Sequence, residues 1–382
     1  MPLMRIAVAM SGGVDSSVAA LLLAREGAEV IGLSMHLWNH DRDGSGAAEG
    51  RCCTLDDLNT ARRAAETVGI PHYILNLEDR FSEAVVKPFI EGYLRGETPI
   101  PCTVCNTEVK FKTLLERSAA LGCDAVATGH YARVETDPAT GESRLLRARD
   151  LSKDQSYFLY DLTSQQLSRA RFPLGEMEKS EVRKIARDAG LPNWDKPDSQ
   201  EVCFVPSGGG PSQFIRDEAE SFGIRLPSMS AARPGSITSV EGEVLGEHDG
   251  TFGFTVGQRR GLGLSSPAPL YVLEVHPQES RVVVGPVDAL MSTEVLLGSV
   301  SFTSQNHPGG SRRVLARIRS RHAEQPALLD LAETPFVRSG RARLVFDSPV
   351  RAAAPGQSAI FFDIDRPELV LGGGVILRQP VG

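Results

Sequence analysis

The sequence predicts an α/β protein with a parallel sheet in its first domain, a small central domain and a C-terminal β barrel. Three observations lead to this prediction. Strand-like and helix-like segments alternate over the first part of the chain, as in a parallel sheet covered by helices on both faces. A glycine-rich loop follows the first strand-like segment. Beyond about residue 290 the chain turns to short alternating strands, which are typical of a barrel. Its 382 residues suffice for two or three domains.

The first loop has the composition of an anion site. The apolar run 6–10 predicts a buried strand and the Ala/Leu-rich run 18–25 a helix, so the glycines and serines between them form a strand-to-helix turn. Glycine lets the backbone approach a ligand, and the free N–H groups of a helix start favour an anion. Asp15 in this loop indicates a bridging Mg²⁺, because a carboxylate beside phosphates usually implies one. The loop is neither a Walker P-loop nor a G-x-G-x-x-G motif.

The following segments continue the alternation. They predict strands over 29–38, 72–77 and 123–128, helices over 55–68, 81–94, 106–121 and 174–189, and a mobile loop over 39–51. Ligands of parallel sheets bind where the strands end. The glycine loop, the strand end 35–38 and the tetrapeptide 128–131 all fall at such ends, so the sequence predicts a nucleotide pocket at this edge.

Individual residues at this edge have competing interpretations. Met35 either fills the core or packs against a purine. Gly129 lets the backbone approach a ribose. His130 is either a capped loop histidine or a substrate contact, because imidazole serves both purposes.

The second half of the chain changes in character. The segment 206–211, PSGGGP, predicts a flexible hinge, and helical periodicity stops after about residue 221. Two strands, 269–275 and 281–284, bracket a turn. Alternating runs at 314–318, 341–346, 358–362 and 374–377 predict the barrel. The resulting domains are 1–205 with the parallel sheet, 206–280 as the small central domain, and 281–382 as the barrel.

Charge and hydropathy limit the possible binding partners and location of the protein. The formal net charge of −7 argues weakly against nucleic acid as a partner, but five arginines cluster between residues 312 and 321, and Arg259 and Arg260 lie in a glycine-rich turn. A basic cluster is either a solvated face or a binding surface. We find neither a signal peptide nor an apolar run long enough to span a membrane, so a cytoplasmic location is expected.

Six cysteines suggest thiol chemistry rather than a disulfide scaffold. Cys105 lies just before the helix predicted from residue 106, and a thiol at a helix start has a lowered pKa. Cys203 lies almost a hundred residues further on. Either Cys102, Cys105 and Cys203 bind a metal or an iron–sulfur cluster, or Cys105 and Cys203 form a redox pair that carries sulfur as a persulfide, or all three are small loop hydrophobes.

Several motifs together resemble known proteins. The loop Ser-Gly-Gly-Val-Asp-Ser-Ser at residues 11–17 resembles that of the ATP pyrophosphatase family, which adenylates its substrates. With it, in the same order as in bacterial tRNA-specific 2-thiouridylases, come Thr-Gly-His-Tyr (128–131), Lys-Asp-Gln-Ser-Tyr-Phe-Leu (153–159), Ser-Gln-Glu-Val-Cys-Phe (199–204) and Gly-Gln-Arg-Arg-Gly-Leu-Gly (257–263). Cys105-Asn106 also stands just before Glu-Val-Lys-Phe-Lys, as in that family. The resemblance covers nearly the whole chain.

The resemblance implies an activity and a set of site residues. These enzymes thiolate C2 of the wobble uridine (position 34) in tRNAs for Lys, Glu and Gln: they adenylate the C2 oxygen, release pyrophosphate and then deliver sulfur. Cys203 matches the persulfide cysteine and Cys105 the other catalytic cysteine. The residues matched to ATP binding are Ala9, Met10, Ser11, Gly12, Gly13, Val14, Asp15, Ser16, Met35 and Gly129. Those matched to tRNA binding are Ile100, Pro101, Cys102, His130, Lys153, Asp154, Gln155, Arg319, Ser320 and Gln357.

The chain departs from the family pattern in two places. Many members have Asn-Pro-Asp where this chain has Ile100-Pro101-Cys102, and Arg319-Ser320 replaces a more usual Arg-Tyr, so an expected stacking partner is missing. The extra thiol keeps the iron–sulfur alternative open. Expected cofactors are otherwise ATP and Mg²⁺, without an assigned metal-ligand set. Expected partners are tRNA and a sulfur-relay or cysteine desulfurase donor. The protein is expected to act as a monomer and without a membrane.

Two other functions fit parts of the sequence. A ligase or amidotransferase-like synthetase for a small molecule would share the glycine loop, but it would need neither Cys105 nor Cys203. A non-catalytic RNA-binding protein with a relic nucleotide fold would not require Asp15. Pyrophosphate exchange into ATP, measured with and without tRNA, separates these functions.

Overall fold

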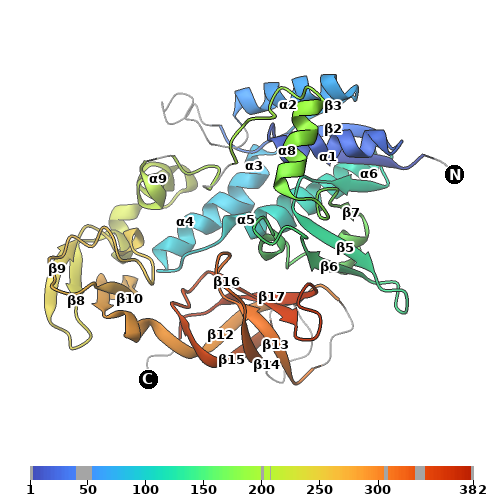
Figure 1. Cartoon of the computed structure of the whole chain (residues 1–382). Coiled ribbons are helices and arrows are strands. Elements are labelled where there is room, and N and C mark those ends of the chain that lie inside the picture. Colours follow the sequence, from blue (N-terminus) through green and yellow to red (C-terminus); the bar gives the residue numbers. More distant parts are fainter. Residues whose placement is uncertain are drawn as a thin grey trace.

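Figure 1 shows the computed structural model, which describes residues 3–39, 54–198, 202–206, 208–304, 309–331 and 340–379. The mobile loop predicted over 39–51 falls almost entirely outside these residues. Within them, no helix has both the length and the apolar character needed to cross a membrane.

A parallel sheet forms the centre of the first domain, as predicted, with a fifth strand, β7 (Ala170–Arg171), beyond the four predicted ones. Its strand order is β3-β2-β1-β4-β7. The strands are β1 (Arg5–Ala9), β2 (Glu29–His36), β3 (His72–Asn76), β4 (Ala125–Ala127) and β7 (Ala170–Arg171). The central strand β1 is buried on both faces, because successive side chains point to opposite sides of the sheet. Ile6 and Val8 enter one apolar cluster and Ala7 and Ala9 the other.

Helices cover both faces of this sheet. The cluster on the Ile6 face contains side chains of α1 (Val14–Arg25), α2 (Leu55–Val68) and α8 (Lys179–Asp188). The cluster on the Ala7 face contains side chains of α3 (Glu78–Phe81), the π-helical segment η2 (Ser82–Val86), α4 (Lys87–Leu94), the π-helical segment η3 (Cys105–Thr113) and α6 (Leu114–Ala120). The second cluster continues into α9 (Gly210–Glu218) through Phe214 and Ile215.

One helix begins earlier than predicted. The helix expected from residue 106 starts at Pro101, as α5 (Pro101–Val104), and runs on through η3 into α6. Proline is favoured in the first turn of a helix, because its missing N–H would have no partner there and its φ angle is already helical. Cys105 therefore lies one turn inside a helical run, and the prediction that it lies at a helix start is wrong.

The middle domain is a four-stranded sheet with the order β10-β11-β8-β9. Its strands are β8 (Gly235–Thr238), β9 (Val244–His248), β10 (Tyr271–His276) and β11 (Arg281–Gly285). Because β11 pairs with both β8 and β10, residues 281–285 belong to this sheet. We therefore propose that the third domain begins after Gly285 rather than at residue 281. The predicted hinge 206–211 includes residue 207, outside the described residues, and its residue Gly210 begins α9.

The third domain is a closed six-stranded barrel, as predicted. The strand order is β12-β15-β14-β13-β16-β17. Its strands are β12 (Met291–Phe302), β13 (Ser311–Arg317), β14 (Gln325–Leu331), β15 (Gly340–Arg351), β16 (Ser358–Asp363) and β17 (Val370–Ile376). A hairpin of the first domain, β5 (Ala132–Thr136) with β6 (Ser143–Arg147), lies beside the barrel (Figure 1). An apolar cluster that includes Tyr157, Ile360 and Phe362 joins the two domains.

The three domains meet around one segment, between α4 and α5, which lie at the centre of the molecule in Figure 1. The backbone N–H of Thr98 donates to the carbonyl of Pro355 in the barrel domain (2.7 Å). Its hydroxyl lies 3.2 Å from that of Thr255 in the middle domain. The segment that leads into Pro101 and Cys105 is thus positioned by both other domains.

Candidate functional site

The glycine loop between β1 and α1 has the geometry of an anion site. Gly12 has a φ of +76°, and a Cβ atom there would clash with the backbone of Asp57 in α2. The Ser16 hydroxyl accepts from the N–H of Ser11 (3.2 Å) and donates to the carbonyl of Gly13 (3.0 Å). Gly13 is the N-cap of α1 and has no side chain to bond to the first-turn N–H groups. Since those groups lack intrahelical partners, they can bind an anion.

Asn193 and Lys196, far along the chain, bond to the backbone of this loop. The Asn193 amide donates to the Gly12 carbonyl and to the Ser17 hydroxyl, both at 3.0 Å. Lys196 forms an ion pair with Asp57 and lies 3.4 Å from the same Gly12 carbonyl. Sequence reasoning missed Asn193 and Lys196, because nothing in the local pattern around them indicates a contact about 180 residues away.

Asp15 is paired with a lysine that sequence reasoning also missed. The Lys179 ammonium donates to both oxygens of the Asp15 carboxylate (2.7 and 2.8 Å), and the Tyr131 hydroxyl donates to one of them (3.0 Å). The same ammonium lies 2.8 Å from Asp198. The predicted role of Asp15 as a Mg²⁺ ligand therefore competes with an internal ion pair.

Asp198 forms ion pairs with three basic side chains. Besides Lys179 it binds Lys153 (2.9 Å) and Arg183 (3.2 Å). Burial alone would raise the pKa of Asp198, but the hydrogen bonds and positive charges of Lys179 and Lys153 outweigh burial and lower it to about 2. Asp198 is thus ionised at neutral pH. It connects Lys153, a predicted tRNA contact, to the glycine loop.

Two other predicted site residues lie at the same edge of the sheet. Gly129 packs directly on the start of α1, where a Cβ atom would lie 2.6 Å from the backbone nitrogen of Ser16. Met35 is buried in the apolar cluster on the Ala7 face. This matches the core role considered for Met35, and its contact with a purine stays a prediction.

The thiols differ in exposure. Cys105 is 6% exposed and belongs to the apolar cluster on the Ala7 face. Cys203 is partly buried and packs against this same cluster, next to Phe204. Cys102 is exposed. In the part of the chain that the structure describes, no three His, Cys, Asp or Glu side chains are placed to hold a metal ion together, so the three thiols do not fit a cluster as arranged.

Two of the predicted tRNA contacts in the segment 153–155, Asp154 and Gln155, are turned inward, whereas the Lys153 side chain is 38% exposed. The Asp154 carboxylate is fully buried: it accepts from the Ser156 hydroxyl (2.8 Å) and pairs with Arg317 of the barrel (3.2 Å). The Gln155 side chain accepts from the N–H of Tyr131 (2.9 Å). Asp154 and Gln155 therefore hold protein segments together in this structure, and their contact with tRNA stays a prediction.

The predicted tRNA contacts of the barrel domain lie near the domain junction. The Arg319 guanidinium donates to the carbonyls of Val256 (3.2 Å) and Ala352 (2.9 Å), which joins the middle domain to the barrel. The Gln357 amide donates to the Thr98 carbonyl (2.7 Å), just before the predicted base-contact residues Ile100, Pro101 and Cys102. Ser320 is exposed, Ile100 is partly buried and Pro101 is buried.

Most of the predicted basic cluster is engaged within the protein. Arg312 pairs with Asp363, Arg313 with Asp347, and Arg317 with Asp154. Together with Arg319, four of the five arginines therefore make internal contacts, and Arg321 is exposed. Arg259 and Arg260, in the glycine-rich turn of the middle domain, are also exposed.

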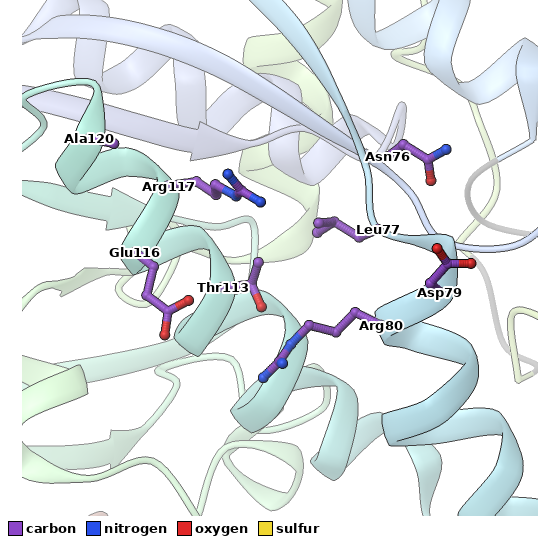
Figure 2. Close-up of a pocket in the computed structure, with 8 residues that line it drawn as sticks. All are labelled: Asn76, Leu77, Asp79, Arg80, Thr113, Glu116, Arg117 and Ala120. Atoms are coloured by element: carbon purple, nitrogen blue, oxygen red, sulfur yellow. The ribbon is translucent and has the colours of Figure 1, made fainter.

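A separate pocket of about 660 Å³ lies where β3 ends, between α3 and α6 (Figure 2). Arg80 of α3 and Arg117 of α6 contribute its positive charge, and Asp79 and Glu116 its negative charge. Its lining residues are Asn76, Leu77, Asp79, Arg80, Thr113, Glu116, Arg117 and Ala120. The pocket contains neither the glycine loop nor any of the predicted thiols, so it is distinct from the site described above.

Three family models match consecutive parts of the chain. The tRNA methyl transferase HUP domain matches residues 4–207, the tRNA methyl transferase PRC-barrel domain residues 226–286, and the aminomethyltransferase beta-barrel domain residues 292–376. The three ranges correspond to the parallel-sheet domain, the middle domain and the barrel.

Curated relatives match nearly the whole chain. A protein of Solibacter usitatus named tRNA-specific 2-thiouridylase MnmA is 48% identical over 382 residues, which cover 98% of this chain and all of that protein. A protein of the same name from Acidobacterium capsulatum is 46% identical, over 97% of this chain and 98% of that protein. Likeness to solved structures is weak: a 4-thiouridine synthetase–RNA complex with bound ATP has a TM-score of 0.33 and 17% identity, over 57% of this chain and 50% of that chain.

Proposed function

Because this chain belongs to the family of tRNA-specific 2-thiouridylases, and is a tRNA sulfurtransferase, we propose that it uses ATP to replace the C2 oxygen of the wobble uridine (position 34) by sulfur. The products are 2-thiouridine in the tRNA, AMP and pyrophosphate. The observation that carries this proposal is that Cys105 and Cys203, almost a hundred residues apart, lie at the same apolar cluster: Cys105 is part of it, and Cys203 packs against it. Neither a small-molecule ligase nor a binding protein requires these two cysteines.

The first step activates the uridine. Its C2 oxygen attacks the α-phosphorus of ATP, the bond from this phosphorus to the β-phosphate breaks, and pyrophosphate leaves. The loop Ala9–Ser16 binds the phosphates, with Met35 and Gly129 beside the rest of the nucleotide. The bare N-cap of α1 supports this assignment, because first-turn N–H groups lower the energy of an anion placed there. Adenylation converts the C2 oxygen into part of a good leaving group.

The second step transfers sulfur. The terminal sulfur of a persulfide on Cys203 attacks C2, and AMP leaves with the former C2 oxygen. The transferred sulfur then bridges C2 and the Cys203 sulfur. A Cys105 thiolate attacks the Cys203 sulfur, which forms a Cys105–Cys203 disulfide and releases 2-thiouridine. If Cys105 instead liberates hydrosulfide before the attack on C2, the products are the same.

Each turnover requires external partners. A thiol reductant reduces the disulfide, and a donor protein of the sulfur-relay or cysteine desulfurase class restores the persulfide. The tRNA substrates are those for Lys, Glu and Gln, bound by a monomer, with Ile100, Pro101 and Cys102 facing the target base. The position of Thr98 supports this placement, because two other domains hold the backbone just before these residues.

The proposal includes Mg²⁺ as a companion of ATP but no step on a metal ion or cluster. Mg²⁺ would accompany the phosphates of ATP, and Asp15 is the carboxylate of the glycine loop that would bind it. Both oxygens of Asp15 are bound by Lys179, so we derive no step through the metal. The three thiols do not form a ligand group in the described residues, so we also derive no step through an iron–sulfur cluster.

The proposal is tested with the full chain, ATP, Mg²⁺, a cysteine desulfurase with cysteine as the donor of sulfane sulfur, a thiol reductant and unmodified tRNA that carries a wobble uridine. We expect 2-thiouridine in the digested nucleosides by mass spectrometry, and pyrophosphate exchange that depends on tRNA. Cys105→Ser and Cys203→Ser should each abolish 2-thiouridine while ATP affinity stays unchanged. Cys123→Ala is the matched control, since this buried cysteine lies in the same cluster and has no role in the proposal.

Three results contradict the proposal. Full thiolation by either serine variant would exclude the two-thiol mechanism. Exchange that requires a small-molecule acid instead of tRNA would favour a ligase. If thiolation appears only after anaerobic reconstitution with iron and sulfide, the cluster alternative replaces the persulfide.

A further inference from the structure

The proposed sulfur transfer uses the thiols of Cys105 and Cys203 but not that of Cys102. Cys102 stands where many members of the family have an aspartate. A carboxylate takes no part in thiol–disulfide exchange, whereas a thiol does. This difference therefore adds a group capable of exchange three residues before Cys105.

Cys102 and Cys105 belong to one helical turn. At the junction of α5 and η3, the backbone N–H of Cys105 donates to the carbonyls of both Pro101 and Cys102. Helix geometry places Cα atoms three residues apart at about 5 Å, which lies within the range that disulfides span. The helical run becomes π-helical at Cys105, and such turns are rare but concentrated at functional sites. The backbone of this turn thus suits a bond between the two cysteines.

The three thiols differ in their access to solvent. Cys102 is exposed, whereas Cys105 is buried in the apolar cluster on the Ala7 face and Cys203 is partly buried against that cluster. The rate of thiol–disulfide exchange depends on which sulfur is attacked and on access to it. An external protein thiol therefore reaches a disulfide that includes Cys102 more easily than one between Cys105 and Cys203.

We propose that Cys102 is a resolving thiol, which transfers the disulfide formed in each turnover from the buried pair Cys105–Cys203 to the surface. This inference rests on the proposed function, because that reaction forms the buried disulfide. The Cys102 thiolate attacks the Cys105 sulfur, the bond between Cys105 and Cys203 breaks, and Cys203 leaves as a thiolate. The products are a Cys102–Cys105 disulfide and a reduced Cys203, so this step is an exchange without net oxidation or reduction.

A dithiol protein of the thioredoxin class completes the cycle. One of its thiolates attacks the exposed Cys102 sulfur, and Cys105 leaves as a thiolate. Its second thiol then attacks the mixed disulfide and releases Cys102, so the dithiol supplies two electrons and two protons and becomes a disulfide itself. Because Cys203 is already reduced after the first exchange, it can accept a new persulfide sulfur before the external reductant arrives.

The first experiment maps disulfides rather than thiolation, because Cys102 also lies at the proposed base contact. The full chain, Cys102→Ser and Cys203→Ser are each oxidised with one equivalent of diamide, and the remaining thiols are blocked with N-ethylmaleimide. Peptide mass spectrometry identifies the linked pairs and separates them from any that involve the other three cysteines. We expect the Cys105–Cys203 pair in Cys102→Ser, the Cys102–Cys105 pair in Cys203→Ser, and both pairs in the full chain.

The second experiment measures how fast thioredoxin removes the Cys105–Cys203 disulfide from the oxidised proteins. We expect removal from Cys102→Ser to be at least about 10-fold slower than from the wild type, because a thiol fixed on the same turn acts at a higher effective concentration than a dissolved one. Cys102→Ser/Val104→Cys is the matched control. Val104 is 39% exposed on this turn, but adjacent residues of a helix do not face each other, so the moved thiol should not restore the rate.

The outcomes separate this inference from the proposed function. If Cys203→Ser forms no Cys102–Cys105 disulfide, or if thioredoxin reduces the wild type and Cys102→Ser equally fast, the inference alone is overturned. Full recovery of the rate in the double variant also overturns it, because any exposed thiol on this turn would then suffice. If Cys102→Ser forms no Cys105–Cys203 disulfide, these two thiols do not meet, and the proposed sulfur transfer fails together with this inference.

Discussion

His130 shows how burial decides the role of a single residue. Its ring lies near those of Phe111 and Phe172, and its Nδ1 lies 2.8 Å from the Thr128 hydroxyl. Burial, followed by the positive charge of Lys110, lowers the pKa of His130 to about 3. At neutral pH this residue is uncharged. If it contacts tRNA as predicted, it does so as a neutral imidazole and not as a cation that pairs with phosphate.

This shift predicts a pH dependence of stability. Between the ordinary histidine pKa of 6.5 and about 3, the unfolded chain binds a proton that folded His130 does not. The contribution of neutral His130 to the unfolding free energy is therefore complete above pH 6.5 and is lost as the pH falls toward 3. We expect the unfolding free energy of His130→Gln to fall less steeply on acidification than that of the wild type. The difference should be about 1 kcal/mol per pH unit in this window.

Urea unfolding at pH 7, 6 and 5 measures this effect. Some acid sensitivity should persist in the variant, because burial also lowers the pKa values of His72, His248 and His322. His276→Gln serves as the control, since this histidine bonds to Glu274 near the surface. Identical slopes for wild type and His130→Gln would contradict the burial argument.

At the scale of elements, the two glycines of the loop differ although the sequence presents them as equals. Gly12 has a φ of +76° and packs against the backbone of Asp57. Gly13 has a φ of −83°, and the nearest atom to a Cβ placed there is the Ser11 hydroxyl oxygen, at 3.5 Å. Only Gly12 therefore needs to be glycine both for its conformation and for space.

This difference predicts distinct effects of alanine. Gly27→Ala measures strain alone, since Gly27 has a φ of +87° with nothing within 4 Å, and should cost about 1–2 kcal/mol. Gly12→Ala should cost more and abolish ATP binding, because α2 must move away from the loop. Gly13→Ala should retain the fold and most ATP affinity. Chemical denaturation and calorimetry measure both quantities, and a Gly12→Ala protein as stable as Gly27→Ala would refute the steric argument.

Local sequence predicts elements better than it predicts where they meet. The loop, the parallel strands and the barrel strands follow from patterns within a few residues of one another. The start of α5 at Pro101 did not, because a stretch with two prolines, at 99 and 101, is as typical of a turn as of the first turn of a helix. The pairing of Asp15 with Lys179 joins residues 164 positions apart, and neither residue carries a local signal for the other.

At the scale of the whole molecule, the segment 153–157 anchors the barrel to the first domain. Asp154 pairs with Arg317, and the Arg317 guanidinium lies over the Tyr157 ring at 5.6 Å. The Tyr157 hydroxyl donates to the carbonyl of Ser358 in β16 (2.7 Å). The resemblance to the 2-thiouridylases assigned Asp154 to tRNA, because the motif 153–159 matches one of that family. Only the folded chain shows that the barrel covers this carboxylate.

This anchor predicts how the barrel contributes to function. Arg317→Leu leaves the buried Asp154 with fewer partners and should lower the unfolding free energy by about 3 kcal/mol. It should also weaken tRNA binding, because the barrel would lose its fixed position beside the Thr98 segment. ATP affinity should persist, since the glycine loop makes no contact with Arg317. Urea unfolding and filter binding of tRNA measure the two effects.

A matched variant and a double variant test the reasoning. Arg313→Leu removes an exposed ion pair with Asp347 and should change neither stability nor tRNA affinity, because exposed pairs contribute little. Arg317→Leu/Asp154→Leu removes both buried charges, and should recover much of the lost stability. If the double variant is as unstable as the sum of the single variants, packing rather than the ion pair joins the domains. Recovered stability without recovered tRNA binding would show that Asp154 or Arg317 serves tRNA binding apart from its effect on stability.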